Sequence, residues 1–154
     1  MADYIFDSSG IAKRYVTETG SAWVQGLTNQ SAGHAVYLAA ITGVEIVSAI
    51  SRRLRHGSMT APDATAAVAR FQADFTGVFR VLPVSSAIIA RAMQVAQKHA
   101  LRGYDAVQLA VALEAQALCA SLGLPPVTLV SADTELNMAA LAEGLLVENP
   151  NNHP

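Results

Sequence analysis

Four acidic residues stand where a strand is expected to give way to a helix or where a helix is expected to begin: Asp7, Glu45, Asp105 and Asp133. Asp and Glu are favoured at such positions because they accept hydrogen bonds from the free N–H groups of a helix N-terminus. Each acid taken alone therefore has a structural explanation. Glu45 has a second one, because Thr42 and Glu45 have the spacing of a capping box.

The elements that must position these acids are short apolar runs that alternate with longer helical patterns. Strands are expected at residues 4–6, 36–41, 79–84, 127–130 and 145–148. Helices are expected at residues 8–16, 21–27, 42–56, 60–76, 86–101, 104–122 and 134–142, with Gly103 as the stop of the fifth. Strands that are apolar on both faces and joined by helices indicate an α/β fold with a mainly parallel sheet. Ligands of such sheets bind at the carboxyl ends of the strands, where the strand order reverses.

Carboxylates brought together at one sheet edge repel one another unless a cation joins them. The sequence has one Cys and four His without close ligand spacing, which argues against zinc. An all-oxygen site suits Mg²⁺ or Mn²⁺, which can generate a hydroxide nucleophile for phosphodiester displacement. Ser8 and Ser131 flank two of the acids and either orient them or serve ordinary turn chemistry.

Composition limits the remaining possibilities. The 154 residues are 52% hydrophobic and 14% charged, which indicates one domain, expected at 1–150, with a short tail at 151–154. The net charge of −2 gives no global electrostatic reason to bind nucleic acid, and the lone Cys119 supports no disulfide framework. No membrane span or signal peptide is expected, so we expect a soluble cytoplasmic protein. The apolar helices at 61–79 and 106–122 favour a dimer or a partner contact.

Four blocks follow one another in register along nearly the whole chain: YIFDSS (4–9), TGVE (42–45), LRGYDAVQL (101–109) and SADTELNMAA (131–140). Together they resemble the PIN-domain family, and most closely its VapC toxins of type II VapBC toxin–antitoxin systems. The resemblance implies a PIN-like three-layer α/β domain in which helices flank a five-stranded sheet.

The resemblance also implies an activity, that of an endoribonuclease dependent on Mg²⁺ or Mn²⁺. It places a catalytic acidic quartet on Asp7, Glu45, Asp105 and Asp133. Asp7 and Asp105 would be the main metal ligands, and Asn137 would give polar support. The partners implied are an RNA substrate, a VapB-type antitoxin and a second copy of the toxin, hence a homodimer and a toxin–antitoxin hetero-oligomer.

Basic and aromatic residues give weaker signals. The basic candidates for contact with RNA or antitoxin at the edge of the site are Lys13, Arg14, Arg52, Arg53 and Arg102. Each has an alternative as a solvated or ion-paired side chain, and Arg52 and Arg53 are expected to lie too far from Glu45 to reach the scissile phosphate. The aromatic residues that could stack on bases, or could instead belong to the core or an interface, are Tyr15, Trp23, Tyr37 and Tyr104.

Two other functions stay open from the sequence. A non-catalytic PIN module would only bind RNA or protein, and an activity assay separates it from a nuclease. A haloacid-dehalogenase-like phosphatase also has an Asp after its first strand, but that chemistry needs a second Asp two residues later, where this chain has Ser9.

Overall fold

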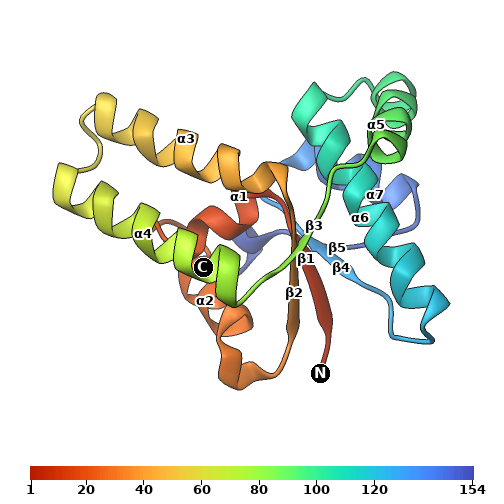
Figure 1. The fold of residues 1–154 in the computed structure, drawn as a ribbon, viewed down its shortest axis with the longest axis horizontal. Helices are drawn as coiled ribbons and strands as arrows, with labels where there is room; N and C mark the ends of the chain where they lie inside the picture. The colour runs from red at the N-terminus through yellow and green to blue at the C-terminus, as the bar shows by residue number, and fades with distance from the viewer.

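The computed structural model describes residues 1–154 and contains one five-stranded sheet in the order β3-β2-β1-β4-β5. All four strand pairings are parallel, which confirms the predicted α/β class (Figure 1). The strands are β1 (Asp3–Phe6), β2 (Ala35–Ala39), β3 (Arg80–Leu82), β4 (Thr128–Val130) and β5 (Leu146–Glu148).

Helices cover both faces of the sheet and form three layers with it (Figure 1). One face carries α1 (Ser8–Ile11), α2 (Ser21–Thr28), α3 (Ile41–Arg55) and α4 (Ala61–Gly77), packed on a core that includes Phe6 and Leu38. The other carries α5 (Ser86–His99), α6 (Gly103–Ser121) and α7 (Thr134–Ala142), packed on a core that includes Ile5 and Leu129. Single 3₁₀ turns span Ala12–Arg14, Gln30–Ala32 and Pro150–Asn152.

The strand order reverses between β1 and β4, because the chain proceeds outward from β1 to β3 on one side and from β4 to β5 on the other. Here α1 follows β1 after one residue and lies directly over the end of β4. A Cβ atom at Gly10 would collide with the carbonyl oxygen of Val130. The close approach of α1 to β4 therefore requires a glycine at this position.

Three local predictions are wrong. The capping box is absent, because α3 begins at Ile41 and the Thr42 hydroxyl is buried against α6, where it accepts a hydrogen bond from Gln108. Gly103 does not end α5 but begins α6, and Ala100 (φ 53°) takes the left-handed position that ends α5. The helix expected at 8–16 is a single α-helical turn followed by a 3₁₀ turn.

The apolar character of α6 has an internal explanation. Nine residues of α6 are buried, because α6 packs against the sheet, α5 and α7. The hydrophobic residues of α6 therefore belong largely to the core of this chain. No partner contact is needed to explain how many of them α6 carries. No helix in the structure has the length and hydropathy to cross a membrane.

The packing of α1 on β4 predicts the effect of adding one methyl group. Gly10→Ala should lower the free energy of unfolding by about 1–3 kcal/mol, the usual cost of overpacking. Gly26→Ala is the matched control, because Gly26 is an exposed residue of α2 with no atom near its missing Cβ. It should be neutral or stabilising by up to about 1 kcal/mol. Equal denaturation midpoints for the two variants would contradict the close α1–β4 contact.

Candidate active site

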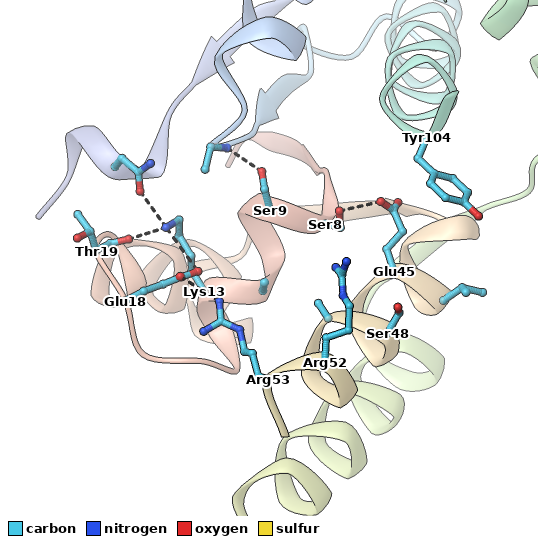
Figure 2. Close-up of a pocket in the computed structure, with 15 residues that line it drawn as sticks. Ser8, Ser9, Lys13, Glu18, Thr19, Glu45, Ser48, Arg52, Arg53 and Tyr104 are labelled. Carbon is cyan, nitrogen blue, oxygen red and sulfur yellow. Dashed lines mark hydrogen bonds and ion pairs between the residues drawn. The ribbon is translucent and has the colours of Figure 1, made fainter. Parts of the chain in front are cut away.

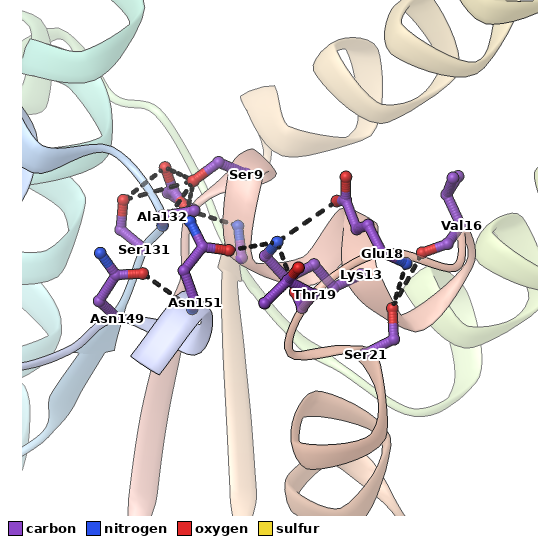
Figure 3. Close-up of polar contacts among 12 residues, drawn as sticks. Ser9, Lys13, Val16, Glu18, Thr19, Ser21, Ser131, Ala132, Asn149 and Asn151 are labelled. Carbon is purple, nitrogen blue, oxygen red and sulfur yellow. Dashed lines mark hydrogen bonds and ion pairs between the residues drawn. The ribbon is translucent and has the colours of Figure 1, made fainter. Parts of the chain in front are cut away.

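Asp7 lies at the carboxyl end of β1 and is only 3% exposed. Its carboxylate accepts hydrogen bonds from the backbone N–H of Gly10 at 2.8 Å and from the hydroxyl of Ser131 at 2.9 Å. The Ser9 hydroxyl lies 2.8 and 2.9 Å from the two carboxylate oxygens. Figure 3 shows Ser9 and Ser131 approaching each other from α1 and from the end of β4. Asp7 is thus fixed by donors from both sides of the switch point.

Burial has a measurable electrostatic consequence for Asp7. Desolvation raises the pKa of this carboxyl from 3.8 to about 7, against the lowering effect of the hydrogen bonds from Gly10, Ser9 and Ser131. The charge of Glu45 adds a smaller upward contribution to the pKa. A carboxylate that is costly to ionise in a polar pocket favours the approach of a cation.

Glu45 lies in α3 with its carboxylate turned toward α1 and α6. Its Oε2 accepts a hydrogen bond from the Ser8 hydroxyl at 3.0 Å, and its Oε1 accepts one from Gln108 Nε2 at 2.7 Å. The same Gln108 nitrogen donates to the Thr42 hydroxyl at 2.9 Å. Gln108 is a buried neutral donor that fixes an acid on another helix. Sequence reasoning gave Gln108 no role, although its position three residues after Asp105 puts both on one helix face.

The other two acids belong to helix starts on the opposite side of the sheet. Asp133 is the N-cap of α7 and accepts a hydrogen bond from the backbone N–H of Leu136 at 2.9 Å. Asp105 is half-buried in the first turn of α6. Desolvation raises the pKa of Asp105, and the charges of Asp133 and Glu45 raise it further. These couplings mean that members of the acidic quartet interact electrostatically across the sheet edge.

Asn137 lies beside the quartet. Its side-chain nitrogen donates to the backbone carbonyl of Ser131 at 2.8 Å, which ties α7 to the end of β4. Its Oδ1 atom is buried and has no hydrogen-bond partner. A buried acceptor without a donor is rare in folded proteins.

The donor set fits a hydrated divalent cation in its chemistry. All the candidate ligands are carboxylate oxygens, which Mg²⁺ and Mn²⁺ prefer. No three His, Cys, Asp or Glu side chains lie close enough together to form a closed metal cage. Mg²⁺ usually keeps several waters and takes only one or two carboxylates, so an open arrangement is compatible with it.

The five basic candidates have different surroundings. Arg52 and Arg53 line a cavity of about 660 Å³ together with Glu45. Lys13 also lines this cavity, but it is buried. Arg14 is not at the acids, because its guanidinium binds Asp74 and Thr28 on another part of the surface. Arg102 is exposed next to α6, and its charge lowers the pKa of Asp105.

The C-terminal residues pack next to the cavity. Asn151 Oδ1 accepts a hydrogen bond from Lys13 at 2.8 Å, a contact visible in Figure 3. The His153 ring stacks on Trp23 of α2, with ring centroids 4.0 Å apart and an interplanar angle of 4°. Of the other aromatic candidates, Tyr15 and Tyr37 are buried, whereas Tyr104 is exposed and lines the cavity.

Known proteins share this fold and sequence pattern. Ribonuclease VapC45 of Mycobacterium tuberculosis is 29% identical over 142 residues, which cover 92% of each chain. The structure of FitAB bound to an IR36 DNA fragment aligns with a TM-score of 0.65 at 20% identity, over 96% of this chain and 94% of that one. VapBC2 from Rickettsia felis, bound to a DNA fragment from their promoter, aligns with a TM-score of 0.61 at 12% identity, over 96% and 98%.

At such identities the two solved structures support the fold alone. The match to a family model shows more than the fold, because it shows family membership. The PIN domain model matches residues 4–141, a span that includes most of β1, all of β2, β3 and β4, and all four acids of the quartet. This chain therefore belongs to the PIN domain family.

Proposed function

We propose that this chain is a divalent-metal-dependent endoribonuclease and the toxin of a VapBC-type toxin–antitoxin system. The observation that carries the proposal is the buried Asp7 carboxylate at the switch point of the sheet. Burial and, to a smaller extent, the charge of Glu45, another acid of the quartet, raise its pKa to about 7. The similarity to Ribonuclease VapC45 supports hydrolysis of RNA as the reaction.

Asp7 and Asp105 would hold the metal ion, with Glu45 and Asp133 in support. When bound, Mg²⁺ or Mn²⁺ would supply an activated water and neutralise charge on the scissile phosphate. The residues of the chain orient the ligands. Ser9 and Ser131 fix Asp7, and the Ser8 and Gln108 side chains fix Glu45.

The alternatives have less support. For the phosphatase, the position two residues after Asp7 holds Ser9, and its hydroxyl already donates to the Asp7 carboxylate. For a non-catalytic PIN module, nothing would require an acid to be buried at high electrostatic cost. A binding surface could use exposed carboxylates instead.

The partner we propose is a VapB-type antitoxin with a short amphipathic segment. An apolar groove of about 400 Å³ between α3 and α4 is lined by residues that include Val47, Ile50, Leu54 and Val68. Such a groove suits the apolar face of a helix. An Arg or Lys on the same segment would complement the acidic quartet. A homodimer of the toxin stays a prediction from the family resemblance.

The raised pKa of Asp7 predicts a pH-dependent stability. Between about pH 4 and pH 7 the folded state keeps a proton that the unfolded state has released, so the free energy of unfolding falls as the pH rises through this window. In chelator, the melting temperature of the wild type should therefore be lower at pH 8 than at pH 5. Asp7→Asn should remove most of this difference, whereas Asp63→Asn, which deletes an exposed carboxylate on α4, should keep it. An unchanged difference in Asp7→Asn would place the titrating group elsewhere.

Metal binding predicts a stabilisation that depends on the same carboxylate. Mg²⁺ or Mn²⁺ at 100 times its Kd should stabilise the wild type by about 2.7 kcal/mol. Thermal melts at pH 8 should show this increase in the wild type and not in Asp7→Asn. Asp7→Asn also relieves repulsion, so its metal-free melting temperature can exceed that of the wild type. Metal-dependent RNA cleavage by a wild type whose melting temperature never shifts would contradict metal binding by the folded quartet.

Catalysis predicts both cleavage and toxicity. Purified wild type should cleave total RNA in Mg²⁺, and Asp105→Ala should be slower by about a hundredfold or more, because a lost metal ligand removes several kcal/mol of transition-state stabilisation. Induction in a bacterial host should arrest growth for the wild type and not for Asp105→Ala at equal soluble expression. A fully toxic Asp105→Ala would separate the lethal activity from this site.

A further inference from the structure

Glu45 is the one member of the quartet that lines the cavity shown in Figure 2. The lining also includes Ser8, Tyr104 and Ala132, which directly adjoin the other three acids in the sequence. One wall is the face of α3 that carries Glu45, Ser48 and Arg52, and another is formed by Ser8 and Ser9 of α1. Tyr104, at the start of α6, completes the opening. With a volume of about 660 Å³, this cavity exceeds what a metal ion and its waters need.

Two of the three cations along this cavity already share an acidic partner. Lys13 Nζ lies 3.6 Å from Glu18 Oε1, and Arg53 Nη2 lies 3.3 Å from Glu18 Oε2. The Lys13 ammonium also donates to the Thr19 carbonyl and to Asn151 Oδ1, each at 2.8 Å. Glu18 thus engages both cations, and Lys13 has a structural role under the C-terminal residues.

Arg52 is the third cation, and its side chain has no hydrogen bond or ion pair in the structure. It is exposed, and in Figure 2 its guanidinium points along α3 toward Glu45 and Ser8. Arg52 follows Glu45 by seven residues, so both lie on one face of α3, with a rise of about 10 Å between them. A free guanidinium at this spacing can bind a phosphate that neighbours the scissile one, and its planar fork suits phosphate oxygens.

Tyr104 offers a second kind of contact. Its side chain is 59% exposed although it directly precedes Asp105, and it pairs with no other aromatic ring of the chain. Figure 2 shows its ring across the cavity opening from Arg52. An exposed ring beside a free cation is the combination with which proteins bind single-stranded nucleic acid, by stacking on a base and pairing with the backbone.

We propose that the cavity is a nucleotide subsite for single-stranded RNA. Arg52 binds a backbone phosphate adjacent to the cleaved bond, and Tyr104 stacks on the base of that nucleotide. Lys13 and Arg53 do not take part, because Glu18 engages them. This inference rests on the proposed ribonuclease function and adds the residues that hold the substrate beside the quartet.

The test is the affinity of a fluorescein-labelled single-stranded RNA oligonucleotide, measured by anisotropy in chelator so that no cleavage occurs. Arg52→Gln should weaken binding by about tenfold or more, as expected for the loss of a hydrogen bond to a charged group. It should also reduce the slope of log Kd against log salt by about 0.7, the share of one phosphate contact on a single strand. Arg53→Gln removes the same charge from the next residue and should change neither quantity.

Stacking is tested separately. Tyr104→Ala should weaken binding by about tenfold, within the range for the loss of one base–aromatic stack, and Tyr104→Phe should bind as the wild type does. An oligonucleotide of abasic ribose phosphates should bind the wild type and Tyr104→Ala equally while still distinguishing Arg52→Gln. Melting temperatures of the Arg52 and Tyr104 variants should match that of the wild type, because both side chains are exposed.

The outcomes separate the subsite from the function. Wild-type RNA affinity in Arg52→Gln and Tyr104→Ala, with RNA cleavage by the wild type in Mg²⁺, would overturn the subsite alone and leave the cavity to a peptide partner. Loss of affinity in these variants without any RNA cleavage by the wild type would instead overturn the proposed nuclease. An equal loss in Arg53→Gln and Arg52→Gln would show a diffuse charge effect and also overturn the subsite.

Discussion

The burial of one carboxylate constrains this structure more than any other single feature. Asp7 has lost nearly all contact with water, and a buried carboxylate needs hydrogen-bond donors to be tolerated. The donors come from α1 and from Ser131 at the end of β4, so they exist only where β1 and β4 lie side by side. The lack of a side chain at Gly10 lets α1 approach close enough to supply the backbone donor. The geometry of the site therefore depends both on the strand order and on the contact between α1 and β4.

The positions of Asp7 and Asp133 could be predicted from local sequence, but Glu45 lies beyond the first turn of α3. The environments of the acids could not be predicted. The ends of β1 and β4 follow from short apolar runs, so the junctions of Asp7 and Asp133 were found correctly. The prediction of a capping box was wrong because α6 covers Thr42, whose hydroxyl accepts a hydrogen bond from Gln108. That partnership joins residues 66 positions apart and leaves no periodic signal. The sequence also favoured a dimer or a partner contact for α6, because a sequence pattern does not reveal that the sheet, α5 and α7 cover this helix.

Charge pairing is the other property that the sequence could not give. Arg14 and Arg52 are both arginines. The Arg14 side chain binds Asp74 and Thr28, whereas the Arg52 side chain has no partner. The difference depends on tertiary neighbours that are 14 to 60 residues away from Arg14 in the chain. Residue type and spacing thus identified the basic candidates. Only the fold shows which of them are free to bind a ligand. Whether the quartet binds metal stays a prediction.

The stacked pair of Trp23 and His153 gives the molecule a built-in optical reporter. The chain has a single tryptophan, and its ring lies face to face with an imidazole from the C-terminal residues. Tryptophan fluorescence of the folded protein therefore reports whether His153 is docked on α2. An expression tag fused after Pro154 begins two residues beyond His153, close to this stack and to the Asn151 contact with Lys13. A tag fused before Met1 is therefore the better choice for experiments that use this reporter.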